Sequence, residues 1–190
     1  MGARVRHRDL TRARSIVDGM EVRAIRRRDL GRVCRALTER TPAQHEHRFR
    51  EQAAGRYRYL IAWDGSRPVG HVGLVLPSDR HPTDRCEWGD AGIVEDLWVQ
   101  ERARGRGLGR ALMTGLEREA RAAGVPAIGL DTGVDVGYEV ARGLYGRMGY
   151  ERRSDPFIVS AGLPEGHPTL PYWIEIVTRW SKPLRASDPP

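Results

Sequence analysis

The run of residues 94–123 constrains this chain most and reads VEDLWVQERARGRGLGRALMTGLEREARAA. Bulky and β-branched residues surround Glu95 and Asp96, so the run is expected to begin as a strand that carries two carboxylates. A glycine-rich turn follows at 104–109. Apolar residues then recur at the spacing of one helix face: Leu108, Leu112, Leu116, Ala120 and Ala123. Strand, turn and helix are therefore predicted to form one unit.

The glycine-rich turn suits a pyrophosphate. The backbone can approach a ligand closely where side chains are missing, and the first N–H groups of a helix have no partner within it. The glycines are Gly105, Gly107 and Gly109, and three arginines add positive charge to the helix dipole: Arg104, Arg106 and Arg110. Other phosphate motifs fit poorly, because no Gly-Lys-Ser/Thr ends the turn and Arg110 replaces the third glycine of a dinucleotide fingerprint. A purely structural turn is the alternative.

Two stretches resemble one known family. The order Val99, Arg104, Gly107, Gly109 resembles the acyl-CoA-binding Arg/Gln-x-x-Gly-x-Gly/Ala motif of the GCN5-related N-acetyltransferase (GNAT) superfamily. Further residues match that family's second signature helix and its closing Gly-aromatic pair: Ala141, Leu144, Tyr145, Gly149 and Tyr150. The resemblance covers residues 21–180 and implies an acyltransferase, with acetyl-CoA as co-substrate.

The fold class expected from this resemblance is α/β, with a mixed, mostly antiparallel central sheet. The family fold has about six to seven strands flanked by about four helices, and its strands four and five splay apart around acyl-CoA. The order of strand-like and helix-like segments along the chain agrees with that architecture. We expect a flexible N-terminal extension over 1–19, a single acetyltransferase domain over 20–181 and a disordered tail over 182–190.

Composition limits the classes of partner. The net charge is +7, but residues 1–19 hold five arginines and two aspartates, a net +3, and no basic stripe interleaved with aromatics is apparent. No nucleic-acid partner is therefore expected. No apolar run reaches the roughly eighteen residues of a membrane span, and the start lacks the apolar centre of a secretory signal. These features predict a cytoplasmic protein without a membrane partner.

The cysteines and the paired histidines do not indicate a metal. Cys34 and Cys86 are far apart in sequence, which favours reduced thiols over a disulfide or a zinc site. His45 and His47 are two positions apart on a predicted helix and do not share a face. We interpret them as solvated or substrate-side residues. His71, inside a strand-like run, is expected to be packed.

Amine acetylation needs a base. An alkyl amine is mostly protonated near neutral pH, so a carboxylate must remove a proton before the amine attacks the thioester. Glu95 lies four residues before Val99, at the position of the strand-four glutamate of polyamine-type GNAT enzymes, which the resemblance implies is the base. Strand alternation directs Asp96 to the opposite face unless the strand bulges. A Glu95 that only pairs with an arginine is the structural alternative.

The resemblance also implies the remaining site residues. Tyr145 would donate a proton or hydrogen bond to the departing CoA sulfur, although a tyrosine packed in the core is the alternative. A backbone N–H near Leu97, Trp98 or Val99 would meet the oxyanion. Tyr138 stands where the family often has an asparagine near the pantetheine or pyrophosphate. The remaining residues predicted to bind the cofactor are those of the glycine-rich turn and the start of the helix: Arg104, Gly105, Arg106, Gly107, Leu108, Gly109 and Arg110.

The predicted function is acetyl-CoA-dependent transfer of an acetyl group directly to a primary amine. The expected acceptor is a small molecule such as a polyamine, an amino-sugar or an amino-acid-like amine, because acids before the key strand would attract a cation: Asp79, Asp84, Glu87 and Asp90. The loop over 161–171 is a candidate substrate lid. An acetyltransferase of proteins or peptides and a non-catalytic acyl-CoA-binding or nucleic-acid-binding module are the alternatives. A homodimer stays open, because sequence does not determine the oligomeric state.

Overall fold

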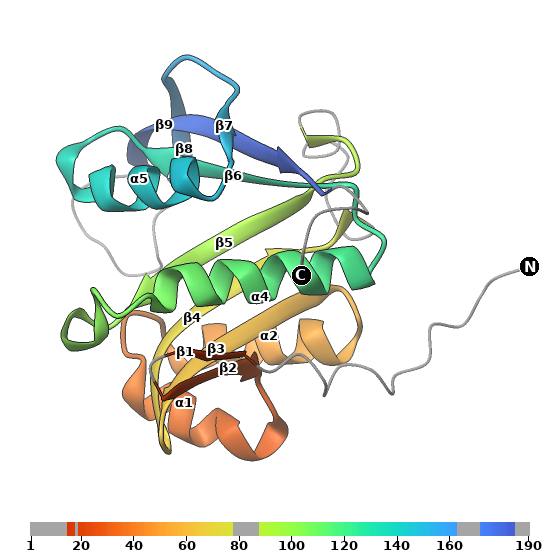
Figure 1. Ribbon diagram of the computed structural model, residues 1–190, viewed down its shortest axis with the longest axis vertical. Coiled ribbons are helices and arrows are strands. Elements are labelled where there is room, and N and C mark those ends of the chain that lie inside the picture. Colours follow the sequence, from red (N-terminus) through yellow and green to blue (C-terminus); the bar gives the residue numbers. More distant parts are fainter. Residues whose placement is uncertain (1–14, 18, 78–87, 163–171, 185–190) are drawn as a thin grey trace, which may run out of the picture. The chain divides into compact units, whose positions relative to one another are not determined.

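The computed structural model describes residues 15–17, 19–77, 88–162 and 172–184 (Figure 1). The chain divides into two compact units, of which unit 1 comprises Met1–Ile128 with Leu184–Pro190 and unit 2 comprises Gly129–Pro183. Each unit is described by itself.

Unit 1 contains five antiparallel strands in the order of the chain, each paired with the next. The strands are β1 (Ser15–Val17), β2 (Met20–Ala24), β3 (Tyr57–Asp64), β4 (Arg67–Val75) and β5 (Gly92–Val99). A tight turn joins β3 to β4, with Gly65 at φ 56°, where glycine adopts the left-handed conformation without a steric penalty.

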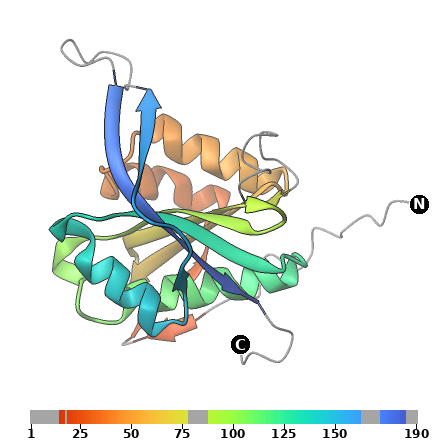
Figure 2. The same ribbon diagram turned by 90° about the horizontal axis from the view of Figure 1, so that it is seen from above.

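Helices cover both faces of this sheet. They are α1 (Leu30–Ala36), α2 (Pro42–Ala53) and α4 (Leu108–Ala122), with short 3-10 turns η1 (Arg27–Asp29) and η3 (Glu101–Ala103). Within unit 1, the orange α1 and α2 lie on one side of the sheet and the green α4 on the other (Figure 2). The Thr41 hydroxyl caps α2, because it accepts the Gln44 N–H at 3.3 Å, and Pro42 occupies the first turn.

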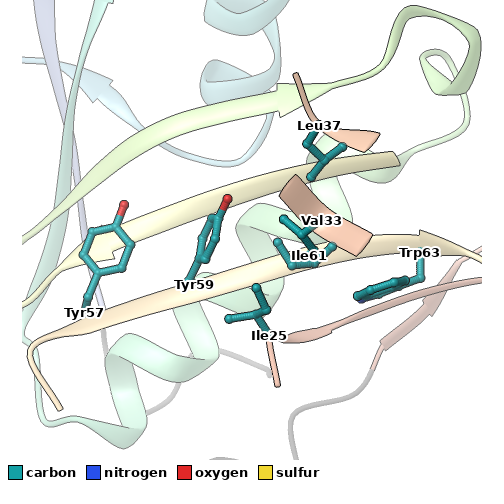
Figure 3. Packing of buried hydrophobic residues seen from close by; sticks show 7 residues of the cluster. All are labelled: Ile25, Val33, Leu37, Tyr57, Tyr59, Ile61 and Trp63. Carbon is teal, nitrogen blue, oxygen red and sulfur yellow. The ribbon is translucent and has the colours of Figure 1, made fainter. Parts of the chain in front are cut away.

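Alternate residues of β3 build the core beneath α1 and α2. Tyr57, Tyr59, Ile61 and Trp63 project from the same side of the strand (Figure 3). They form a buried cluster with residues from the adjoining segments: Ile25, Val33 and Leu37. The α4 side of the sheet buries the intervening residues, such as Leu60, against the apolar stripe of α4 that the sequence predicted.

Unit 2 contains a smaller sheet and one α-helix. Its elements are β6 (Ala127–Gly133), η4 (Val136–Tyr138), α5 (Glu139–Arg147), β7 (Glu151–Arg152), β8 (Phe157–Gly162) and β9 (Tyr172–Pro183), the first two residues of β6 being counted with unit 1. β9 lies between β6 and β7 and also pairs with β8. The pairs β7–β9 and β8–β9 are antiparallel.

The expected mixed α/β, mostly antiparallel architecture is confirmed. The described residues form nine strands rather than six or seven, but β1 and β7 have only three and two residues. The described part of the chain has four α-helices, as expected. Among these described helices, none is long and apolar enough to cross a membrane.

The described structure extends beyond the predicted domain boundaries at both ends. Ser15–Val17, predicted as part of a flexible extension over 1–19, pairs with β2, because an edge strand can form backbone hydrogen bonds without any marked side-chain pattern. β9 continues to Pro183, and the Leu184 N–H donates to the Pro126 carbonyl at 2.8 Å, so the predicted tail does not begin at 182. Residues 1–14, 18 and 185–190 lie outside the described residues.

Two predicted loop features also fall largely outside the described residues. Of the candidate lid over 161–171, the first two residues belong to β8 and the rest are not described. Asp79, Asp84 and Glu87, three of the four acids predicted to attract a cation, are likewise outside the description, whereas Asp90 is exposed.

Candidate active site

The glycine-rich turn lies at the N-terminus of α4. Gly105 and Gly107 have φ of 74° and 78°, in the left-handed region that favours glycine, and Gly107 is the N-cap of α4. Among the described residues, the backbone N–H groups of Gly107, Leu108 and Gly109 find no acceptor. Three N–H groups and a helix dipole thus meet at one point, an arrangement that suits an anion.

The three arginines of this turn differ in their contacts. The Arg104 Nε donates to the Val99 carbonyl at 2.9 Å, which ties the turn to the end of β5. Arg106 lies 3.7 Å from the Asp64 carboxylate, and Arg110 is exposed. Leu108 is fully buried, so only its backbone can face a ligand.

β5 contains a bulge between Glu95 and Trp98. Glu95 pairs with Gly73 and Trp98 with His71, so two residues of β5 stand opposite one residue of β4. Asp96 occupies the bulge with φ 51° and is the only non-glycine residue with positive φ among those the structure describes. The strand therefore does bulge, which removes the expected opposition between the faces of Glu95 and Asp96.

Two arginines hold the Asp96 carboxylate. The Arg40 Nε donates to Oδ2 at 2.9 Å, and a second nitrogen of Arg40 pairs with Oδ1. Arg48 of α2 pairs with Oδ2, and its guanidinium lies 5.6 Å from the centre of the Tyr59 ring. The charge of Asp96 is therefore compensated within the protein.

Glu95 has a different environment. Its Oε2 accepts a hydrogen bond of 3.0 Å from the Tyr57 hydroxyl, and no arginine or lysine in the described part of the chain pairs with it. Burial and the adjacent Glu95 charge raise the pKa of Tyr57 well above its usual range, so this hydroxyl remains a donor. The structural alternative, in which Glu95 pairs with an arginine, is not observed among these residues.

A cavity of about 530 Å³ opens beside Glu95. It is lined by α2 and the adjoining strands: Ala43, Gln44, His47, Arg48, Glu51, Arg56, Tyr57, Val75 and Glu95. Arg56 donates two hydrogen bonds, of 2.7 and 2.8 Å, to Glu51, and Arg48 is engaged by Asp96. Glu95 is thus the lining carboxylate that has no cationic partner among the described residues, and a cation would be favoured there.

Two buried histidines pack against the ring of Tyr59. His45 and His47 were interpreted as solvated or substrate-side residues, and His47 does line the cavity. His45, in contrast, is fully buried: its Nε2 lies 2.8 Å from the Leu37 carbonyl and its Nδ1 lies 2.6 Å from the Tyr59 hydroxyl. Since a carbonyl only accepts, Nε2 carries the proton and Nδ1 accepts from Tyr59. His71 is also buried, and its Nε2 lies 2.6 Å from Glu39. Burial lowers the pKa of His71 despite this carboxylate.

Unit 2 carries the two predicted tyrosines. Tyr145 of α5 is 6% exposed, its ring lies 5.9 Å from that of Tyr150, and its hydroxyl has no hydrogen-bond partner among the described residues. Burial, followed by the proximity of Tyr138, raises the pKa of Tyr145 to about 12. Tyr138 packs across Gly133, where a Cβ would lie 2.4 Å from its ring.

Sequence reasoning singled out Glu95 and the glycine-rich turn as candidate site residues. It missed Tyr57 and Arg48, which line the cavity, and Arg40, which contacts Asp96. Tyr57, Arg40 and Arg48 are distant in sequence from β5, and no motif marks them. One signal was available: Tyr57, Tyr59, Ile61 and Trp63 alternate along β3 and define the side on which α2 packs. Trp98 belongs to that packing and lines no described part of the cavity.

The sequence and fold resemble known acetyltransferases. A family model described as "Acetyltransferase (GNAT) family" matches residues 22–150. A protein named IAA acetyltransferase from Azospirillum brasilense is 33% identical over 126 residues, which cover 65% of this chain and 74% of that protein.

Solved structures show the same fold at low sequence identity. An N-acetyltransferase from Staphylococcus aureus Mu50 has a TM-score of 0.65 at 13% identity, covering 87% of this chain and 99% of its own. YncA from Salmonella typhimurium, solved with its cofactor acetyl-CoA, has a TM-score of 0.65 at 17% identity, covering 90% and 97%. The ribosomal-protein-S18-alanine N-acetyltransferase from Escherichia coli has a TM-score of 0.60 at 16% identity, covering 89% and 96%.

Proposed function

The chain belongs to the acetyltransferase (GNAT) family, and from this premise we propose that it transfers the acetyl group of acetyl-CoA directly to the primary amine of a small molecule. One observation carries the proposal. The Glu95 carboxylate lies in a cavity of about 530 Å³, fixed by the Tyr57 hydroxyl and without a cationic partner among the described residues. A protonated amine would supply the missing positive charge.

The glycine-rich turn is the proposed site for the pyrophosphate of acetyl-CoA. Its support is local geometry: the N–H groups of Gly107, Leu108 and Gly109 have no acceptor in the described structure, and they lie at the start of α4. Glycine at 109 leaves the first helical turn without a side chain that would separate a phosphate from these groups.

The proposed chemistry is a direct transfer. Glu95 takes a proton from the bound ammonium, and the freed nitrogen lone pair attacks the thioester carbonyl carbon. The resulting oxyanion accepts a backbone hydrogen bond from residues 97–99. As the carbon–sulfur bond breaks, sulfur leaves with the bonding electrons and takes a proton from Tyr145, the donor that the family resemblance implies. The attacking nitrogen, which still carries a surplus proton, loses that proton to restore the Tyr145 hydroxyl, so the products are a neutral amide and the free thiol of CoA.

Cavity size supports a small acceptor. Sites for small molecules commonly enclose roughly 300–1,000 Å³, and this cavity lies within that range. The wall combines apolar contacts from Val75 and Ala43 with polar groups from His47 and Gln44. An acceptor that pairs an ammonium group with a short polar body would satisfy both kinds of contact.

A screen of acceptors with acetyl-CoA, followed by release of free thiol, tests the proposal. The panel contains polyamines, amino-sugars, amino acids, IAA because of the relative's name, and peptides with free N-termini. We expect turnover with a small amine and a loss of about a hundredfold or more in kcat/KM for Glu95→Gln, which keeps the shape of the side chain but cannot accept the proton. Turnover with peptides alone would favour the protein-directed alternative. Bound acetyl-CoA without turnover on any acceptor would favour a non-catalytic role.

A further inference from the structure

We propose that Arg40 and Arg48 are positioning residues that hold the general base Glu95 in the cavity by fixing Asp96 in the bulge of β5. The inference rests on the proposed function of Glu95. It concerns two residues outside β5 that contact Asp96 and not Glu95.

The bulge allows β5 to place Glu95 in the cavity and Trp98 in the core. In a regular strand, residues three positions apart point to opposite faces. Glu95 and Trp98 are three apart, yet Glu95 reaches Tyr57 and Trp98 packs on the cluster that contains Tyr57. The extra residue in the bulge restores the common face. Without it, either Glu95 would leave the cavity or Trp98 would leave the core.

The bulge depends on an unfavourable backbone conformation. Asp96 has φ 51°, a left-handed conformation that is uncommon for L-residues, although aspartate tolerates it better than most. Such a conformation persists where surrounding contacts hold the residue in it. We therefore expect the contacts of the Asp96 side chain to hold its backbone at positive φ.

Arg40 and Arg48, which lie in two separate segments, make these contacts with Asp96. Arg40 follows α1 in the connection to α2 and contacts both carboxylate oxygens, whereas Arg48 lies within α2 and contacts Oδ2. The Arg48 side chain is only 12% exposed and also lies over Tyr59, so the ion pair is anchored in the packed interior. A carboxylate engaged by two guanidinium groups is a poor proton acceptor. Asp96 therefore acts on conformation, and Glu95 remains the base.

Substitutions at Asp96 distinguish an effect of its backbone conformation from a direct role of its carboxylate in the reaction. Glycine adopts positive φ freely and asparagine tolerates it, whereas the β-branched valine does not. In steady-state assays with the best acceptor from the screen, we expect Asp96→Gly to keep kcat within about threefold. Asp96→Asn tolerates the backbone conformation but loses the ion pairs, so it is expected to lose about tenfold. Asp96→Val is expected to lose about a hundredfold, the scale of a misplaced catalytic group. Titration with CoA is expected to give similar affinities for all three.

A second comparison tests the arginines. Arg40→Ala is expected to lower kcat about tenfold in the wild-type background, with a smaller change in KM, since the base is misplaced rather than removed. The same change in the Asp96→Gly background is expected to lower kcat less than about twofold, because glycine needs no clamp. Arg35→Ala removes an exposed arginine from the end of α1 and is the control that is expected to leave kcat unchanged.

Defined outcomes overturn the inference. Equal losses for Asp96→Gly, Asp96→Asn and Asp96→Val in folded, CoA-binding proteins would show that the Asp96 carboxylate itself takes part in the reaction. An Arg40→Ala variant with full kcat would remove the clamp while leaving the proposed function intact. If wild-type protein turned over no amine, the proposed function would fail, and the clamp would be judged by the coupling between Arg40→Ala and Asp96→Gly in thermal unfolding, where additive effects would overturn it.

Discussion

Tyr57 reaches Glu95 by crossing Gly73. The hydroxyl oxygen of Tyr57 lies 3.0 Å from the Glu95 carboxylate, and a Cβ built on Gly73 would lie 1.7 Å from that same oxygen. Gly73 and Glu95 are paired across β4 and β5, so the missing side chain at 73 is the opening through which the tyrosine meets the carboxylate.

Gly73→Ala is expected to displace the Tyr57 ring and weaken its bond to Glu95. Overpacking of this kind typically destabilises a protein by about 1–3 kcal/mol, and we expect kcat/KM to fall about tenfold as the base loses its fixed position. Denaturant unfolding and steady-state kinetics measure the two effects. In a Tyr57→Leu background the ring is gone, and Gly73→Ala is expected to be nearly neutral for stability. A full stability loss in that background would show that the alanine clashes elsewhere.

Tyr57→Phe is expected to lower kcat/KM about tenfold. The phenyl ring keeps the packing of the tyrosine, but the hydroxyl that fixes the Glu95 carboxylate is lost, so the base is held less well in the cavity. Steady-state kinetics with the best acceptor from the screen measure the loss. A variant with full kcat/KM would show that this hydroxyl is not needed to position the base.

Gly109→Ala is expected to weaken CoA binding without loss of stability. Alanine is the better residue within a helix, but its methyl group would stand in the first turn of α4, where the proposed pyrophosphate approaches the backbone. We expect the Kd for CoA to rise about tenfold in calorimetric titration, equivalent to about 1.4 kcal/mol. Gly31→Ala, at a helical glycine of α1, is the matched control. Unchanged CoA affinity for Gly109→Ala would remove the phosphate role from this turn.

Protonation of His71 is expected to destabilise the fold. Its pKa in the folded protein lies below the ordinary value of 6.5, chiefly because the ring is buried. The unfolded chain therefore binds more protons in this window, and stability rises with pH through it and falls as pH decreases below about 6.5. Urea unfolding at several pH values between about 5 and 8 is expected to show this slope, and His71→Gln to reduce it. A slope that persists unchanged in His71→Gln would assign the proton uptake to another group.

Tyr145→Phe is expected to affect departure of the thiolate. Burial raises the pKa of Tyr145 to about 12, so the hydroxyl is a proton or hydrogen-bond donor throughout the neutral range. The loss in kcat is expected to be smaller with acyl donors whose thiol has a lower pKa, because a better leaving group depends less on an acid. Equal losses with every donor would reassign Tyr145 to packing against Tyr150.

The sequence by itself determined the features that depend on neighbours along the chain. The strand–turn–helix unit, the Thr41 cap of α2 and the β3–β4 hairpin follow from periodicity, capping and turn chemistry within a few residues. Glu95 was singled out through the family resemblance of the contiguous motif that precedes the turn, and its role as the base stays a prediction. The terminal strand β1 was missed, since its backbone pairing leaves little trace in its side chains.

Tertiary structure decided which side chains meet. His45 was predicted to be solvated or substrate-side and is buried, because its ring completes hydrogen bonds to Leu37 and Tyr59 that no local pattern reveals. Likewise, only the register between β4 and β5 shows that the strand bulges at Asp96 and turns that carboxylate toward Arg40 and Arg48. Side-chain alternation is a property of one strand, whereas a bulge is a relation between two strands. The partners of Glu95 and Asp96 were therefore fixed by packing between elements and not by either element alone.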